Sequence, residues 1–469
     1  MKKAIVIGGG ITGLAAAYTL QDNHTDYLLI EKENRLGGKV LTEKKDGFVL
    51  EGGPDCFLSD KPSVAQICAK IGIEDAIIPS NDASKRTFVL NKGKLCELPE
   101  GLMSLVPTKI VPFALSPLVS WPGKFRMALD LFIPKKKVDE DESLATFVKR
   151  RLGAEALDKI AEPLIGGIHA GNPEKMSLKA TFPRFLQMEQ QYGGMMKAML
   201  AGKKNAPPPR VVTPGSKPKT FFMTFNQGMG ELAESIAAKL DADKVWLGKT
   251  VTGLSRYKNE QGQNIYRVEI EGMDPVEAET VIIATPSYVS AKLMQGVDEV
   301  IANKLSEIPQ ASSATVNLAY KKADLNMSIE AFGFVIPQSE KRKIMAVTYS
   351  STKWNNRTPD DQYVLIRAFV GGARNNQFVE LSDEEMSAMV RGEIKEIMGI
   401  TAEPVVTKIF RWRQGMPQYT MGHLERLQEI EKRRSALPGL FIVGASYRGV
   451  GVPDCINSGA TAAEEALKL

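Results

Sequence analysis

The sequence predicts an α/β protein that combines a Rossmann-like dinucleotide-binding domain with a mixed-sheet domain and a helical insertion. Three observations support this fold class. The chain opens with a strand, a glycine turn, a helix and a second strand; its middle is rich in Met, Phe, Leu and Pro; and strand patterns then return before a final strand, glycine loop and helix. A βαβ opening implies a parallel sheet covered on both faces. A chain of 469 residues also exceeds one ordinary domain.

The first element is the βαβ unit at the N-terminus. Apolar runs predict strands over Ala4–Ile7 and Tyr27–Ile30, and small and apolar residues at helical spacing predict a helix over Gly13–Leu20. The turn between them has the GxGxxG pattern, with glycines at positions 8, 10 and 13. Such glycines permit a tight turn, a close approach to a pyrophosphate and close helix–strand packing.

An acidic residue supports a ligand at this turn. Glu31 ends the second strand at about the spacing at which a carboxylate accepts hydrogen bonds from an adenosine ribose. The phosphates would lie at the helix N-terminus, where N–H groups and the helix dipole favour negative charge. The alternative, a glycine-rich turn without a ligand, stays open.

Two further glycine pairs favour FAD over NAD. Arg35-Leu36-Gly37-Gly38 follows the ribose acid, and Glu51-Gly52-Gly53-Pro54-Asp55 comes next. Glycine pairs let the backbone lie against an extended second nucleotide. The alternative is two surface turns, since paired glycines are common in turns.

The rest of the chain divides into segments by composition. We predict a dinucleotide-binding domain built from residues 1–86, 219–300 and 439–469, a mainly helical part over 87–218, and a substrate-binding sheet over 301–438. The later strands are predicted at Val245–Leu254, Val281–Ala284, Ser313–Tyr320, Phe332–Ile336 and Tyr363–Val370.

Two stretches of the middle part and the C-terminal end have distinct patterns. The apolar segment 98–134 is broken by prolines and suits either a membrane-surface or substrate-entry region, or a buried helical pair. The Pro- and Lys-rich segment 206–219 predicts an exposed loop. At the end, strand residues 440–443 feed a small-residue loop, with a helix expected after Ser458. That loop either presents N–H groups to a flavin or simply closes the sheet.

Composition excludes several function classes. The four cysteines are scattered, which disfavours a disulfide framework or a metal site and suits a reducing cytoplasm. We expect no signal peptide and no membrane span. A net charge of +5 without a basic motif argues against nucleic acid. It suits an anionic small molecule or a weak membrane-surface contact.

Several motifs resemble the oxygen-dependent protoporphyrinogen and coproporphyrinogen oxidases of the flavin amine-oxidase superfamily, in particular the Gram-positive bacterial type. The likeness extends from Ile5 to the final helix, which implies an amine-oxidase-like fold. The motifs are Gly53-Pro54-Asp55, Glu162-Pro163-Leu164 with Gly167-Ile168-His169-Ala170-Gly171, Met416-Pro417-Gln418-Tyr419 with Gly422-His423, and Gly444-Ala445-Ser446-Tyr447 with Gly449 to Ile456.

This resemblance implies FAD as cofactor and assigns its contacts. These are Gly8, Gly9, Gly10, Ile11, Thr12, Gly13, Glu31, Lys32, Lys39, Gly53, Pro54, Asp55, Cys56, Val251, Trp412, Val450, Gly451 and Val452. Trp412 is equally compatible with a core aromatic. The substrate contacts implied are Gly167 and Ile168, with Val335 and Phe369 placed by local alignment. No catalytic side chain is expected, because the flavin carries the chemistry.

The implied activity is oxidation of coproporphyrinogen III to coproporphyrin III in haem biosynthesis, by an oxidase acting on CH–CH groups with O₂ as acceptor. Six hydrogens are removed, so three two-electron flavin cycles each yield H₂O₂. Protoporphyrinogen IX oxidase and flavin amine oxidase are the alternatives; a carotenoid-type desaturase and a non-enzymatic FAD scaffold also stay open. The implied location is cytoplasmic or peripheral to the inner face of the membrane.

Two statements about partners complete these predictions. A transient contact with the next enzyme of the haem pathway stays open, as does the weak membrane contact. As a hypothesis, Lys61 or Arg86 meets a substrate propionate.

Overall fold

The first of two large sheets forms the dinucleotide-binding part. The computed structural model describes residues 1–102, 105–107, 109–137, 140–204 and 220–469. The sheet has the strand order β10-β2-β1-β13-β12-β11, with β19 pairing with β13. Its strands are β1 (Lys2–Ile7), β2 (Tyr27–Ile30), β10 (Val245–Trp246), β11 (Val251–Lys258), β12 (Asn264–Ile270), β13 (Val276–Ile283) and β19 (Leu440–Ile442). The pairs among β10, β2, β1, β13 and β19 are parallel, and the β11–β12 hairpin is antiparallel.

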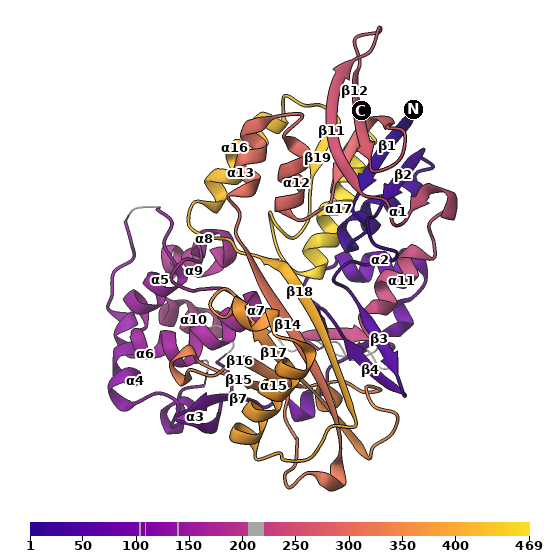
Figure 1. The fold of residues 1–469 in the computed structure, drawn as a ribbon. Coiled ribbons are helices and arrows are strands. Elements are labelled where there is room, and N and C mark those ends of the chain that lie inside the picture. Colours follow the sequence, from indigo (N-terminus) through magenta and orange to yellow (C-terminus); the bar gives the residue numbers. More distant parts are fainter. Residues whose placement is uncertain (103–104, 108, 138–139, 205–219) are drawn as a thin grey trace.

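Helices cover both faces of this sheet, because alternate strand residues belong to different cores. Ala4 and Val6 of β1 pack into one core, whereas Ile5 and Ile7 pack into the other. One face carries α1 (Ile11–Asp22), α2 (Ser63–Ile71), α11 (Gly230–Ala237) and α17 (Val452–Ala466); the other carries α12 (Ser287–Met294), α13 (Glu299–Ser306) and α16 (His423–Arg434). The two chain termini lie close together at this end of the molecule (Figure 1).

The second sheet is mixed and lies below the first in Figure 1. Its strand order is β18-β14-β17-β16-β15-β7-β8, antiparallel except for the β15–β7 pair. The strands are β7 (Thr87–Asn91), β8 (Lys94–Glu97), β14 (Gln310–Lys321), β15 (Gly333–Val335), β16 (Ile344–Tyr349), β17 (Tyr363–Gly371) and β18 (Val406–Pro417). One face packs on α15 (Asp383–Met398) through a core that includes Val316, Ala368 and Val390.

Smaller elements connect these parts. Two small sheets consist of β3 (Thr42–Lys45) with β4 (Phe48–Glu51), and of β5 (Phe57–Leu58), β9 (Phe222–Phe225) and β6 (Ile77–Pro79). The short helices are η1 (Glu74–Ala76), η2 (Asp82–Ser84), η5 (Ala242–Lys244), η6 (Lys322–Asp324), η7 (Gln338–Glu340), α14 (Ser350–Lys353) and η8 (Asn376–Glu380).

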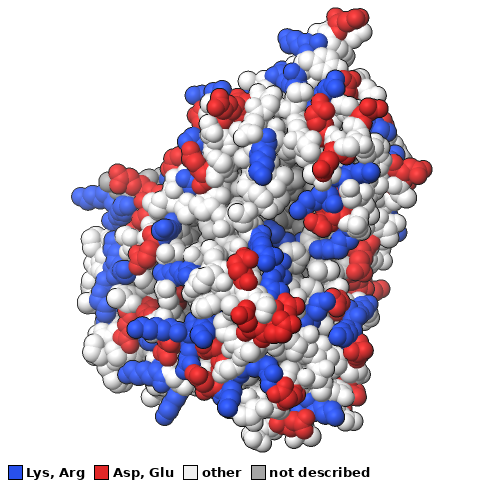
Figure 2. Space-filling view, viewed as in Figure 1, with Lys and Arg blue, Asp and Glu red and all other residues white. Residues whose placement is uncertain are grey.

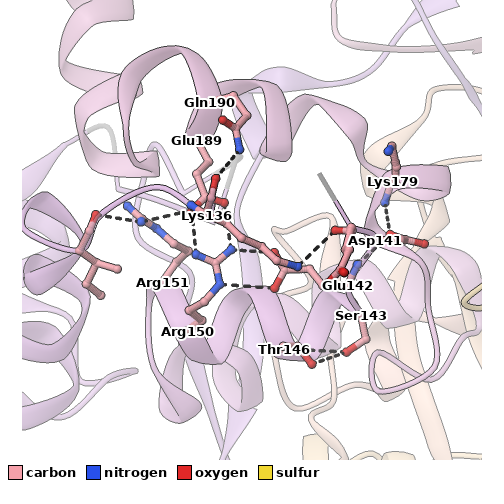
Figure 3. A network of polar contacts seen from close by, with 12 residues as sticks. Lys136, Asp141, Glu142, Ser143, Thr146, Arg150, Arg151, Lys179, Glu189 and Gln190 are labelled. Carbon is pink, nitrogen blue, oxygen red and sulfur yellow. Dashed lines mark hydrogen bonds and ion pairs between the residues drawn. The ribbon is translucent and has the colours of Figure 1, made fainter. Parts of the chain in front are cut away.

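A helical part flanks the second sheet. It contains α3 (Ile110–Leu115), α4 (Trp121–Ala128), η3 (Leu129–Leu131), α5 (Leu144–Arg151), α6 (Ala154–Ala156), the π-helix η4 (Leu157–Gly166), α7 (Gly167–His169), α8 (Leu178–Thr181), α9 (Pro183–Tyr192) and α10 (Met195–Lys204). Charged groups tie it together (Figure 3). Arg150 bonds Glu142 at 2.6 Å and Glu189 at 2.7 Å, while the fully buried Arg151 lies 3.4 Å from Glu189. Buried Glu189 thus joins α9 to both arginines of α5.

The predicted strands and helices match the structure in type, with two differences in extent. The strand expected over Val245–Leu254 is two strands, because Gly248 turns the chain with a φ of +65°. The final helix begins at Val452 rather than after Ser458, since Pro453 in its first turn has no N–H to satisfy and suits a helix start.

The domain boundaries stay a prediction, and two segments cross them. β7 and β8 fall inside the part predicted as mainly helical but belong to the second sheet. Helix α16 falls inside the predicted substrate domain but packs on the first sheet. The predicted loop over 206–219 lies outside the described residues. Among the residues that are described, no helix is long and apolar enough to cross a membrane.

Candidate functional site

The glycine turn after β1 leaves open space where a ligand would approach. A Cβ atom at Gly13 would lie 1.8 Å from the carbonyl oxygen of Gly8, so this glycine is required by helix–strand packing. Gly8 itself has a φ of +102°, which favours glycine. Gly10, the N-cap of α1, differs: a Cβ there would meet no protein atom within 4 Å. The protein's own packing does not require a glycine at this position.

The predicted ribose acid lies against the same turn. The buried carboxylate of Glu31 accepts hydrogen bonds from the backbone N–H groups of Gly9 at 2.6 Å and Glu33 at 2.8 Å. Lys32 is directed away, with an exposed side chain 3.3 Å from the Glu33 carboxylate. Glu31 is therefore bonded to the predicted phosphate turn, whereas the Lys32 side chain is not part of this contact.

The first turn of α1 packs against the middle of α17 near this turn. A Cβ atom at Gly459 of α17 would lie 2.1 Å from the carbonyl oxygen of Thr12 in α1, so the two helices are in close contact. Neither helix has a side-chain hydrogen bond at its N-cap, Gly10 for α1 and Gly451 for α17. Unpaired N–H groups at two neighbouring helix starts favour an anionic ligand.

A loop held by the second sheet faces these helices. The carbonyl oxygen of Gly52 accepts hydrogen bonds from the Trp412 indole at 2.8 Å and the Thr315 hydroxyl at 3.2 Å. The Arg367 guanidinium donates to the carbonyl oxygen of Gly53. Asn317 donates to the carbonyl oxygen of Glu51 at 3.2 Å. Trp412 thus contributes a polar contact to the predicted cofactor loop in addition to packing.

Buried charges continue this loop. The Asp55 carboxylate accepts hydrogen bonds from the Lys353 ammonium at 3.0 Å and the Trp354 indole at 3.2 Å. Burial acts to raise the pKa of Asp55, but Lys353 and Arg367 hold it well below its usual range. The Lys353 ammonium lies 3.8 Å from the Cys56 sulfur, whose pKa burial raises to about 12. Asp55 is therefore ionised and Cys56 is a neutral thiol at physiological pH.

Lys39 connects this loop to the last strand of the second sheet. A Cβ atom at Gly53 would lie 1.8 Å from the carbonyl oxygen of Lys39, so the two backbones touch. The Lys39 ammonium donates to the carbonyl oxygen of Gly415 in β18. Burial lowers the pKa of Lys39, and Cys455 of α17 opposes this effect. The remaining predicted cofactor contact, Val251, starts β11 and packs on the core beneath the sheet.

The predicted substrate contacts Val335 and Phe369 lie on the face of the second sheet that holds the predicted cofactor loop. Val335 is paired with Ala346, Ala346 with Phe369, and Phe369 with Thr315. Directly paired residues of antiparallel strands share a face. Since Thr315 donates to Gly52, this row of side chains lies on the same face as the predicted cofactor loop.

The predicted substrate contact Gly167 lies outside this row of side chains, in the wall of a cavity of about 830 Å³. This cavity lies between the π-helix with α7 and the ends of β15, β16 and β17. Ile168 follows in α7, and its side chain is outside the part that the structure describes. Gly371 also lines the cavity and lies two residues after Phe369 in β17, so the cavity reaches the end of the strand that carries Phe369.

Gln418 and Tyr419, which follow β18, bring together the other segments that carry family motifs. Gln418 donates to the carbonyl oxygen of His169 at 3.1 Å. The Tyr419 ring stacks on His423 with centroids 4.1 Å apart, and the buried His423 contacts the carbonyl oxygen of Tyr447 at 2.9 Å. These contacts give His423 a structural role.

Comparison with known proteins identifies the family. Residues 11–467 match the family described as flavin containing amine oxidoreductase. The chain belongs to this family. It is 36% identical to coproporphyrinogen III oxidase of Bacillus subtilis (strain 168) over 99% of this chain and 98% of that protein, and 32% identical to coproporphyrinogen III oxidase of Staphylococcus aureus over 99% of each. A crystal structure of a putative protoporphyrinogen oxidase from Exiguobacterium sp. 255-15 matches with a TM-score of 0.86 and 31% identity, covering 100% of this chain and 99% of that one.

Family membership confirms the predicted amine-oxidase-like fold and makes the protein an FAD-dependent oxidase. The residues present fit FAD. The open space at Gly10 suits a pyrophosphate, Glu31 suits a ribose, and the starts of α1 and α17 suit negative charge. Which residues contact FAD stays a prediction; most of the predicted set converges here, while Lys32 points away and Val251 lies beyond the turn.

Sequence reasoning missed the side chains that hold the cofactor loop. Thr315, Asn317, Lys353 and Arg367 are buried, and all four come from the second half of the chain. For the three strand residues the signal is a polar side chain in a strand that is otherwise apolar, such as Arg367 within Tyr363–Gly371. Buried polar groups of this kind need partners. Here the strand residues bond loop carbonyls, and Lys353 of α14 bonds the Asp55 carboxylate.

Proposed function

We propose that this protein is an FAD-dependent oxidase that converts coproporphyrinogen III and three O₂ into coproporphyrin III and three H₂O₂, in haem biosynthesis. The observation that supports it is the shared face of the second sheet. Trp412, Thr315 and Arg367 hold the cofactor loop, and the same face carries Val335 and Phe369. Similarity to a coproporphyrinogen III oxidase over nearly the full length of both proteins selects the substrate.

The side chains in this row fit a tetrapyrrole. Val335, Ala346 and Phe369 offer apolar surface, with only the Thr315 hydroxyl as a polar group. They would orient the macrocycle and exclude water from its reacting carbons. FAD, when bound, supplies the two-electron oxidation and returns electrons to O₂. Arg367 places its cation over the Phe369 ring, 4.8 Å from the centroid, which fixes that ring against the loop.

Turnover of two porphyrinogens tests the proposal. The FAD-loaded protein is incubated with coproporphyrinogen III or protoporphyrinogen IX, and porphyrin fluorescence, O₂ uptake and H₂O₂ are followed. We expect three O₂ per porphyrin and at least tenfold higher kcat/KM for the four-carboxylate substrate. If the protein prefers protoporphyrinogen IX, as the name of the Exiguobacterium protein suggests for that relative, the proposed substrate is wrong. If it oxidises only benzylamine, the protein is an amine oxidase.

We also propose that the protein contacts a membrane surface through its helical part. Side chains of α3, α4 and the following turn are unusually exposed for apolar residues: Leu115 80%, Phe132 80%, Phe125 69%, Val111 68%, Ile110 62% and Trp121 60%. Bulky apolar side chains with flanking lysines suit the interface between lipid headgroups and acyl chains. Lys124 lies over the Trp121 ring, 4.6 Å from its centroid.

Flotation with anionic liposomes tests this contact. We expect the unchanged protein to float and the variant Leu115→Glu/Phe125→Glu to stay at the bottom of the gradient. Matched substitutions at the exposed residues Tyr257 in β11 and Met273 after β12, both outside the helical part, should leave flotation intact. If the unchanged protein does not float, the membrane contact is excluded. The transient contact with the next haem-pathway enzyme stays a prediction.

A further inference from the structure

The cavity beside Gly167 has the size of a small-molecule binding site. Its volume of about 830 Å³ lies within the range of roughly 300–1,000 Å³ that such sites have. Four glycines form part of its wall: Gly167, Gly171, Gly371 and Gly372. A Cβ at Gly167 would meet no atom within 4 Å. The wall at Gly167 therefore leaves room for a ligand.

The charges around this cavity are unbalanced. It is lined by the cations Lys149, Lys341, Arg342, Lys343 and Arg374 and by the carboxylates Asp158, Glu162 and Glu174. Each carboxylate already has a cation: Asp158 pairs with Lys159 at 3.1 Å, Glu162 with Arg374 at 3.9 Å, and Glu174 with Lys149 at 2.8 Å. Arg342 pairs with Glu396 outside the cavity. Positive charge is left over.

Lys341 and Lys343 carry this surplus positive charge. Both side chains are exposed, and among the described residues neither has an ion-pair partner within 4 Å. Their neighbour Glu340 is engaged elsewhere, since it accepts hydrogen bonds from the backbone N–H groups of Lys92 at 2.7 Å and Gly93 at 3.0 Å. The two ammonium groups are thus available to an anionic ligand at the cavity.

The backbone fixes where these lysines stand. Lys341 has a φ of +53° and ends the short helix η7, with its N–H bonded to the carbonyl oxygen of Gln338 at 2.9 Å. The N–H of Lys343 donates to the Glu393 carboxylate at 3.2 Å. A turn held at both ends limits the entropy lost when its side chains meet a ligand.

We propose that Lys341 and Lys343 bind propionate carboxylates of the tetrapyrrole and favour a substrate with four carboxylates over one with two. This proposal rests on the proposed function. We prefer these lysines to Lys61 and Arg86, the two cations named from the sequence alone, because Lys61 pairs with Asp454 at 2.6 Å and Arg86 pairs with Glu97 at 2.7 Å. Lys341 and Lys343 determine specificity through charge and take no part in the redox step.

The test compares two double charge reversals. Lys341→Glu/Lys343→Glu changes the cavity, and Lys321→Glu/Lys322→Glu makes the same charge change on two adjacent exposed lysines elsewhere. Binding of the fluorescent product coproporphyrin III to the FAD-loaded enzyme is titrated, with KM and kcat for coproporphyrinogen III. We expect Kd and KM to rise roughly tenfold in the cavity variant only, with kcat unchanged. Binding of coproporphyrin tetramethyl ester should not change.

Two results would overturn the proposal in distinguishable ways. If the unchanged enzyme binds and oxidises the tetrapyrrole and both variants behave alike, the role assigned to the two lysines is wrong, while the proposed function stands. If the unchanged enzyme neither binds nor oxidises it, both fall. Should the glutamate variant lose FAD or fold, Lys341→Gln/Lys343→Gln serves instead: its KM should depend less on NaCl than that of the unchanged enzyme.

Discussion

The Tyr419 hydroxyl donates a hydrogen bond to the carbonyl oxygen of Ala445, at 2.7 Å. The same hydroxyl accepts one from the backbone N–H of Gly449 at 2.9 Å. Tyr419 follows β18 of the second sheet, whereas Ala445 and Gly449 belong to the loop between β19 and α17. One phenol thus clamps the loop that precedes the α17 start, next to the predicted contacts Val450 and Gly451.

The substitution Tyr419→Phe removes both hydrogen bonds but keeps a ring that can stack on His423. Partly buried partners left unpaired cost up to about 1–3 kcal/mol, so we expect a lower unfolding midpoint and a several-fold weaker Kd for FAD. Flavin fluorescence titration of the apoprotein measures the latter. Tyr257→Phe is the matched control, because Tyr257 donates only to Glu277 on the exposed hairpin. Equal FAD affinity in both variants would contradict the clamp.

The substitution Gly10→Ala should separate cofactor binding from folding. A methyl group there meets no protein atom within 4 Å, so the apoprotein should unfold within about 0.5 kcal/mol of the unchanged protein. The same methyl would occupy the space predicted for the pyrophosphate, so we expect FAD affinity to fall at least 100-fold. Denaturant unfolding of the apoprotein and equilibrium dialysis with FAD provide the two measurements.

Gly392→Ala is the control for Gly10→Ala. Gly392 lies inside α15, where an added Cβ also meets nothing within 4 Å. Alanine stabilises a helix interior by roughly 0.5–1 kcal/mol relative to glycine, and FAD binding should not change. If Gly10→Ala bound FAD as tightly as Gly392→Ala, the pyrophosphate would not lie at this turn.

The buried pair of Asp55 and Lys353 should respond strongly to loss of one partner. Lys353→Met leaves the Asp55 carboxylate without its nearest cation, and breaking such a pair costs about 3–5 kcal/mol. The double variant Asp55→Asn/Lys353→Met should recover part of that loss. Thermal and denaturant unfolding of the unchanged protein, Lys353→Met, Asp55→Asn and the double variant gives the coupling. For comparison, removing exposed Lys2, which lies 2.9 Å from Asp26, should cost less than about 1 kcal/mol.

Acid stability should depend on His169. Burial lowers the pKa of His169 from 6.5 to about 4, so the unfolded chain takes up a proton before the folded one does as the pH falls. Stability is therefore lost between pH 6.5 and pH 4, by about 2–3 kcal/mol from this group. His169→Gln should reduce the loss measured by denaturant unfolding at pH 7 and pH 4.5. Exposed His24→Gln should leave it unchanged, and identical acid profiles for all three proteins would contradict the assignment.

The sequence alone predicted those elements that are specified by neighbouring residues. The glycine turn, Glu31 and the first two strands lie where the pattern predicts, because a βαβ unit is specified by neighbouring residues. Family motifs extended this to the loop over Gly52–Cys56, whereas the final helix, expected after Ser458, begins at Val452. Gln418 and Tyr419 illustrate the limit: the motif marks them, but only the fold shows that they bond His169 and Ala445.

What the sequence did not reveal depends on pairing between distant strands. Arg367 and Thr315 reach Gly52 and Gly53 across more than 260 positions of the chain. Register between β14, β17 and β18 decides which of their residues face the cofactor loop, and a shift by one residue would reverse every side chain. The cavity lysines are likewise invisible in sequence, since their carboxylate neighbours are used up by other cations only in the folded state.

The first sheet is assembled from three separate stretches of the chain, so its parts are synthesised at different times. β1 and β2 appear first, but β13 follows only after more than half the chain, and β19 with α17 comes last. The α1 face that α17 covers stays bare until α17 itself has been synthesised. Nascent chains that lack α17 therefore carry exposed apolar surface. We expect FAD to bind only after α17 has packed on α1, because the start of α17 belongs to the predicted cofactor site.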